Sequence, residues 1–228
     1  MSVKASTEKQ LFKRSLSPKL GIFLLFIGTI LLFSPLFSNM YTKHQQAILL
    51  EEYRKAFIDK PGLNFLVLQE GDEGTAFLLN EGAPTGFDNV ILAIPRLDVE
   101  VAVLGPPIDY AGYGPMLFKA PVFFSDSVYP GGQGNVAITA HRLDHGSYFY
   151  DLDLLEEGDK IYLETPGLRF EYIVQESKII DETDTSIVRD HADPHYLVLV
   201  TCEPKDTRQP TPIRLAVRAE LEKTELIE

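Results

Sequence analysis

The hydrophobic positions of the chain follow three patterns in succession. Residues 20–37 read LGIFLLFIGTILLFSPLF, an apolar run without a charged residue. In residues 41–58, apolar side chains recur at helical spacing on one face. From residue 90 onward, short runs of Val, Ile, Leu and Tyr partly alternate with polar residues and are separated by Gly and Pro. The pattern predicts two helical segments followed by a β domain.

The apolar run predicts a transmembrane signal anchor. As a helix, residues 20–37 would span about 27 Å, close to the hydrocarbon thickness of a bilayer. Residues 1–19 carry a net charge of +4 from five basic residues and one acidic residue, which favours a cytoplasmic tail. A cleaved signal peptide is the alternative, but Ser34, Pro35 and Ser38 offer a poor cleavage site. We therefore expect a single-pass protein of the cell membrane whose remaining residues form an extracellular domain.

Residues 38–89 are expected to form an extracellular stalk and linker. The helix predicted over residues 41–58 has an apolar face made by Leu49, Tyr53, Ala56 and Phe57. It could continue the membrane helix as a stalk or pack on the domain. Residues 69–89 are rich in Gly, Glu, Asp and Asn, which indicates a linker or surface loops.

Residues 90–222 are expected to form an all-β domain, followed by a C-terminal tail at 223–228. Only residues 148–155 indicate a short helix within it. Many short strands with one short helix favour a closed or nearly closed β-barrel. The predicted strands are Val90–Ile94, Val99–Leu104, Asn135–Ala140, Lys160–Glu164, Arg169–Ile180, Tyr196–Thr201 and Ile213–Leu221.

Charge and cysteine content narrow the function. With the +4 tail set aside, the remaining chain carries a net charge of −16, which disfavours nucleic-acid binding. The single cysteine, Cys202, excludes an internal disulfide. A lone cysteine is more often an inert buried thiol than a reactive one, but an exported free thiol is open to oxidation. Whether Cys202 is reactive therefore has to be judged from the residues around it in the sequence.

Three residues at predicted strand ends have complementary chemistry. Cys202 follows the strand YLVLVT, His141 follows NVAITA, and Arg214 begins IRLAVRAEL. A thiolate can attack an amide carbonyl, an imidazole can protonate the departing amine, and a guanidinium can stabilise the oxyanion. If the barrel brings them to one rim, they suit acyl transfer.

The order of motifs along the chain sharpens this hypothesis. The segments are IPRLDV at 94–99, PGGQGNVAITAHR at 130–142, FYDLD at 149–153 with GDKI at 158–161, LVLVTC at 197–202 and IRLAV at 213–217. In this order they resemble the motifs of the sortases, membrane-anchored cysteine transpeptidases. The resemblance implies an eight-stranded barrel, with Cys202 as nucleophile, His141 as general acid and base, and Arg214 as the oxyanion-stabilising or substrate-positioning residue. Thr201 and Ala140 would touch the substrate.

The resemblance also implies a reaction. A sortase cleaves an LPxTG-like sorting signal through a cysteine thioester and transfers the acyl group to an amine of a cell-wall precursor or of a pilin. Its chemistry needs no metal or organic cofactor. The loop after Cys202 contains Arg208 as well, so Arg208 is the alternative to Arg214. The sequence after the nucleophile leans toward the class D or class E sortases.

Other functions and ligands remain open. Another extracytoplasmic cysteine peptidase or transpeptidase, such as an L,D-transpeptidase, fits less well because it places glycine directly before its cysteine. A non-catalytic, tethered β-barrel binding module is the alternative of a different class. Some sortases bind calcium through acidic loops, and Asp181, Glu182 and Asp184 could supply carboxylates for one ion. His141 and His145 have metal-ligand spacing only on a helix, and we expect no metal there.

Overall fold

The computed structural model describes residues 18–59, 68–70, 76–78, 89–107, 109, 112–132, 134–189, 195–207 and 209–227. The chain divides into two compact units, Met1–Phe37 and Ser38–Glu228. Both predicted helical segments belong to one helix, α1 (Pro18–Asp59). Within the described ranges, no helix combines the length and the hydropathy that a membrane crossing requires.

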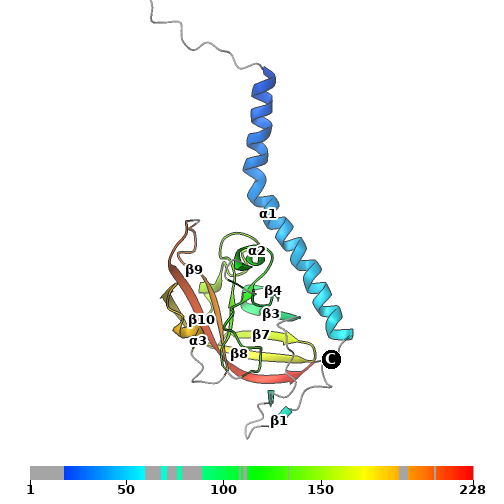
Figure 1. Ribbon diagram of the computed structural model, residues 1–228, viewed down its shortest axis with the longest axis vertical. Coiled ribbons are helices and arrows are strands. Elements are labelled where there is room, and N and C mark those ends of the chain that lie inside the picture. The colour runs from blue at the N-terminus through cyan, green and yellow to red at the C-terminus, as the bar shows by residue number, and fades with distance from the viewer. Residues whose placement is uncertain are drawn as a thin grey trace, which may run out of the picture. The chain divides into compact units, whose positions relative to one another are not determined.

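The larger unit is built on one eight-stranded sheet, whose strands β7, β8 and β10 can be followed in Figure 1. Its strand order is β4-β3-β7-β8-β10-β9-β6-β5. The strands are β3 (Val90–Ile94), β4 (Val99–Val103), β5 (Val122–Phe123), β6 (Val136–Thr139), β7 (Lys160–Thr165), β8 (Leu168–Asp181), β9 (Tyr196–Cys202) and β10 (Ile213–Leu226).

The two edge strands of this sheet meet and nearly close it. Just beyond β4, the Leu104 N–H donates to the Pro121 carbonyl at 2.9 Å, and the Leu104 carbonyl accepts from the Phe123 N–H at 3.0 Å. These bonds form an isolated parallel bridge between Leu104 and Val122. The predicted eight-stranded barrel is thereby confirmed.

Several element boundaries differ from those predicted. Strand β10 continues to Leu226, so the expected tail at 223–228 is wrong for residues 223–226, which pair with the first residues of β8. Strand β5 was not predicted. Within the expected linker, β1 (Leu68–Glu70) and β2 (Ala76–Leu78) form a two-stranded sheet.

The helix predicted at 148–155 is instead a chain of turns ending in one 3-10 helix, η4 (Leu152–Leu154). The buried side chains Phe149, Leu152 and Leu155 recur every third residue, the period of a 3-10 helix rather than an α-helix. The other short helices of the domain are η2 (Pro95–Leu97), α2 (Tyr113–Leu117) and α3 (Ser186–Arg189).

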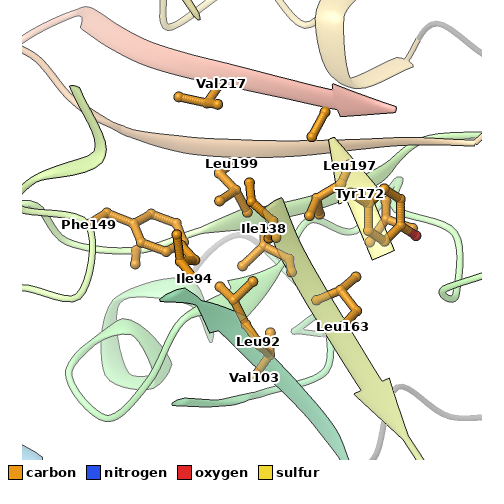
Figure 2. Packing of buried hydrophobic residues seen from close by; sticks show 14 of the residues in the cluster. Leu92, Ile94, Val103, Ile138, Phe149, Leu163, Tyr172, Leu197, Leu199 and Val217 are labelled. Carbon is orange, nitrogen blue, oxygen red and sulfur yellow. The ribbon is translucent and has the colours of Figure 1, made fainter. Parts of the chain in front are cut away.

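The core fills the barrel interior. Figure 2 shows Ile138, Leu199 and Leu92, from three different strands, directed toward one another. Strand β9 is buried on both faces. Leu197 and Leu199 belong to this core, whereas Val198 and Val200 pack in a second cluster with Val188 of α3. Burial on both faces explains why this strand reads as a continuous apolar run.

The second half of α1 packs against the barrel. Tyr53 lies in a cluster with Ile91 and Ala102, and Leu49 and Phe57 pack against it. The predicted apolar face is thus real, and it covers the domain instead of leaving residues 38–59 as a free stalk. Burial of these side chains stabilises the contact through the hydrophobic effect.

Gln46 on the same helix covers the open edge of β4. Its side-chain Oε1 accepts from the Ala102 N–H at 3.0 Å, and its Nε2 donates to the Ala102 carbonyl at 2.9 Å. Side-chain amides present the same donor and acceptor as a neighbouring strand, so Gln46 satisfies backbone groups that an edge strand leaves unpaired.

Replacing Gln46 should therefore loosen β4 locally. In Gln46→Leu the Ala102 backbone loses both partners, and we expect a loss of about 1–3 kcal/mol in the free energy of unfolding. Hydrogen exchange should show faster exchange of the Ala102 amide. Gln45→Leu is the matched control, because Gln45 is only half-buried. Equal Ala102 exchange in the two variants would contradict the assigned role of Gln46.

Candidate active site

Strand register brings the three predicted catalytic residues into one row. Strand β9 pairs antiparallel with β10, and Cys202 lies directly opposite Arg214. On its other side β9 pairs parallel with β6, with Thr139 opposite Val200. Continued by two residues, this register places His141 beside Cys202. The sheet therefore aligns His141, Cys202 and Arg214 on three neighbouring strands.

The side chains of all three residues are on the face of the sheet that points away from the barrel interior. Ala137, Val200 and Ala216 belong to the outer cluster. Side chains alternate between the two faces of a strand. Cys202 lies two residues after Val200, and Arg214 two residues before Ala216, so both side chains are on the outer face. The same alternation, continued two residues past the end of β6, places His141 on that face as well. The partly buried thiol of Cys202 is free of disulfide.

Two hollows meet at this row of residues. One has a volume of about 560 Å³ and is lined by the loop that follows His141 and by residues of the β9–β10 loop. The other has a volume of about 550 Å³ and is lined by α2, α3 and the turn after β8. His141, Cys202 and Arg214 line both. A peptide and a second reactant could thus approach the thiol from two sides.

His141 is held by packing. Its ring stacks on Phe118, with 5.9 Å between ring centroids, and lies 5.3 Å from the His145 ring. Its Nε2 atom is buried and has no hydrogen-bond partner among the described residues. Burial lowers the pKa of His141, the nearby His145 lowers it further, and Asp144 acts in the opposite direction. Neutral imidazole is therefore favoured near pH 7.

Arg214 is fixed by its neighbours on the rim. Its guanidinium forms an ion pair with Glu182 at 2.6 Å and donates to the carbonyls of Ile213, at 3.0 Å, and Thr211. The side chain remains about one-quarter exposed, at 24%. Arg208, the alternative arginine, lies outside the described residues.

Thr201 and Ala140 lie beneath the reactive row. The Thr201 hydroxyl donates to the Ala140 carbonyl at 2.9 Å and ties β9 to the end of β6. Ala140 belongs to the main core cluster. Both residues also border the hollow beside α2. Their predicted contact with substrate stays a prediction, while the hydrogen bond between them gives Thr201 a clear structural role.

Arg142 is a site residue whose function the sequence motif alone did not reveal. Its side chain is 2% exposed and forms an ion pair with Asp153 at 2.6 Å and another with Glu203. It also donates to the Cys202 carbonyl at 3.1 Å and to the Tyr150 carbonyl at 3.3 Å. Arg142 thus connects the residue after His141 to the backbone of Cys202.

Charge balance supports this role. Burial acts to raise the pKa of Asp153, but the hydrogen bonds and charge of Arg142, with Lys205, outweigh it and hold this pKa below its usual value. Asp153 is therefore ionised at neutral pH, as is needed to compensate a buried guanidinium. A positively charged residue directly after a strand-end histidine was the available sequence signal.

The acidic turn after β8 is engaged in local hydrogen bonds. Asp181 accepts from Thr183, and Asp184 accepts from Ser186, while Glu182 is paired with Arg214. Among the described residues no group of three or more His, Cys, Asp or Glu is arranged to hold a metal ion. The calcium site considered from the sequence stays a hypothesis.

Arg142→Gln should impair both stability and turnover. It removes the guanidinium from Glu203 and from Asp153, which keeps only the Lys205 ion pair at 3.4 Å, and it frees the Cys202 carbonyl. Misplacement of the thiol by about 1 Å would then lower kcat by about 100-fold. Peptide-cleavage kinetics and thermal unfolding measure the two effects. Arg96→Gln is the control, because Arg96 also pairs with two carboxylates but on an exposed surface. Similar kcat values for the two variants would remove Arg142 from the site.

Comparison with known proteins agrees with this geometry. Sortase A of Listeria monocytogenes is 30% identical over 220 residues, which cover 92% of this chain and 93% of that protein. Sortase D of Bacillus subtilis is 32% identical over 121 residues, covering 53% of this chain and 57% of that protein. The crystal structure of the Listeria sortase A aligns with a TM-score of 0.52 and 29% identity, over 61% of this chain and 90% of that chain.

These relatives include both A-type and D-type sortases, so the predicted class D or E subclass stays a prediction. A family model described as the sortase domain matches residues 92–222, more than half of the sequence and nearly all of the barrel. The match contains His141, Cys202 and Arg214. The chain therefore belongs to the sortase family, whose members are transpeptidases.

Proposed function

We propose that this sortase cleaves an LPxTG-like sorting signal with Cys202 and transfers the acyl group to an amine of a cell-wall precursor or of a pilin. The observation that carries the proposal is the row formed by His141, Cys202 and Arg214 on adjoining strands, where two hollows meet. A single side-chain row open on two sides suits a reaction that receives one peptide and then one amine.

The first half of the reaction forms a thioester. The Cys202 thiolate attacks the carbonyl carbon of the scissile amide, and the carbonyl oxygen becomes an oxyanion. Arg214 lies directly across the sheet from Cys202, where its fixed positive charge can stabilise that oxyanion. When the tetrahedral species collapses, the C–N bond breaks, and His141 donates a proton to the departing amine.

The second half regenerates the Cys202 thiolate and the protonated imidazole. The incoming amine attacks the thioester carbonyl and gives a proton to His141, which is now neutral. The C–S bond breaks, and the product contains a new amide bond. Because burial and His145 lower the pKa of His141, neutral imidazole is readily available as the base, whereas the imidazolium needed in the first half is the minor form near pH 7.

Single substitutions should separate the three roles. In the full chain, Cys202→Ala should abolish cleavage of a fluorogenic LPxTG peptide, and His141→Ala and Arg214→Ala should each lower kcat/KM by at least about 100-fold. Arg218→Ala is the matched control for Arg214. Arg218 lies on the same strand and face but pairs with Glu176, away from the thiol.

Three results would contradict the assignment. Cleavage that survives Cys202→Ala would exclude the proposed nucleophile. A severe defect in Arg208→Ala together with normal activity in Arg214→Ala would move the arginine role to Arg208. Resistance of Cys202 to a small alkylating reagent in the folded protein would favour a binding module with an inert thiol.

We also propose that residues 20–37 anchor the enzyme in the cell membrane, with residues 1–19 in the cytoplasm. The support is the uncharged apolar run and the +4 charge before it. Within this unit the side chains of Leu25, Phe26 and Ile22 are more than 65% exposed, as expected for a helix that contacts lipid.

Cell fractionation tests the anchor. The full chain should remain in the membrane pellet after an alkaline carbonate wash, because apolar side chains in lipid are not released by charge repulsion. The double variant Phe26→Asp/Ile30→Asp should be released, since charge in the hydrocarbon layer is costly, and Thr29→Ala should behave as the parent. Release of the unaltered chain would exclude the anchor.

A further inference from the structure

Three polar side chains of α1, all within residues 38–42, contact segments that pack around His141. The Ser38 hydroxyl lies 3.4 Å from His145 Nδ1. The side-chain Oδ1 of Asn39 accepts from the Gly146 N–H at 3.3 Å. The Thr42 hydroxyl shares its one proton between two carbonyls, that of Ser38 at 3.1 Å and that of Phe118 at 3.2 Å.

The segments that they contact are the ones that pack on the imidazole. Phe118 stacks on His141, and His145 packs on both rings, 4.3 Å from Phe118 and 5.3 Å from His141. Phe118 follows α2, whereas His145 lies on the loop after β6. One face of α1 thus connects two separate walls of the histidine pocket.

The imidazole depends on these walls for its orientation. His141 Nε2 has no hydrogen-bond partner among the described residues, so no bond at that atom fixes the ring as a carboxylate would. Packing against Phe118 and His145 must limit its rotation instead. A general acid must hold its proton within about 3 Å of the departing atom, so small movements of these walls would matter.

The helix itself is firmly attached further along. Gln46 pairs with both backbone groups of Ala102, Tyr53 is buried against the barrel, and Arg54 forms an ion pair with Glu100. Thr42 is 2% exposed. The positions of Ser38, Asn39 and Thr42 are therefore set by contacts that do not involve the active site.

We propose that Ser38, Asn39 and Thr42 are positioning residues, which orient the catalytic histidine by holding the Phe118 and His145 walls of its pocket. The inference rests on the proposed function, because it gives α1 a role only if His141 is the general acid and base. It assigns catalytic importance to a segment outside the matched family domain, which begins at residue 92.

Variants with an isosteric change isolate this role. Thr42→Val keeps the shape but removes the donor, and Thr42→Ser restores the hydroxyl. We expect the full chain in detergent micelles to lose about tenfold in kcat for Thr42→Val combined with Asn39→Ala and Ser38→Ala. Thr42→Ser alone should retain activity. Met40→Ala/Lys43→Ala is the matched control, because both side chains are exposed on the same turns.

A second readout reports on the imidazole directly. Looser walls relieve the burial that is the largest cause of the lowered His141 pKa, so NMR titration should show this pKa rising toward its ordinary value in the triple variant. The charged and titratable groups that line the hollows with His141 include His145, Asp144 and Arg142 on its own loop. From other segments they include Cys202, Arg214, Asp126, Asp181, Glu182 and Asp184. All of these are unchanged in the variant.

The outcomes separate the two proposals. A lower kcat and a raised His141 pKa, with a thermal unfolding midpoint near that of the control, support the positioning role. Parental kcat and His141 pKa in the triple variant overturn it. If the unaltered chain does not cleave sorting-signal peptides, the proposed function fails, and the His141 titration still decides whether the helix sets the environment of the ring.

Discussion

The site depends on the pairing of one strand with two neighbours of opposite direction. Strand β9 is parallel to β6 and antiparallel to β10, so the end of β6, the end of β9 and the beginning of β10 meet at the same rim. The row of His141, Cys202 and Arg214 follows from that pairing. A register slip of one residue would turn Cys202 into the core, and burial of β9 on both faces makes such a slip costly.

Around this row, the arginines are held by ion pairs and hydrogen bonds, whereas the candidate base His141 is held by packing alone among the described contacts. Arg214 and Arg142 are each secured by carboxylates and carbonyls, whereas His141 is held by aromatic contacts. The arrangement suits the proposed acyl transfer, in which the guanidinium would keep its charge throughout and the imidazole would change its charge twice in each cycle. Contacts from α1 to the aromatic walls extend this support beyond the barrel.

Prediction from sequence succeeded where local pattern and burial agree. The central strands, with their β-branched runs, were placed within a few residues. It failed where an element is very short, or where its extent depends on the strand with which it pairs and not on its own sequence. Two-residue β5 is too short to have a pattern, the continuation of β10 depends on pairing with β8, and the turns at 148–155 follow a three-residue period that resembles a helix.

By itself the sequence determined the family, the barrel and the three candidate catalytic side chains, because strand patterning and ordered motifs are local properties of the chain. Only the tertiary structure decided that His141, Cys202 and Arg214 share one outward row, since strand pairing joins residues up to 73 positions apart in the sequence. The same holds for Arg142, whose partners come from two segments far apart in the sequence. It also holds for the polar residues of α1, which acquire a role only beside the loops that they contact.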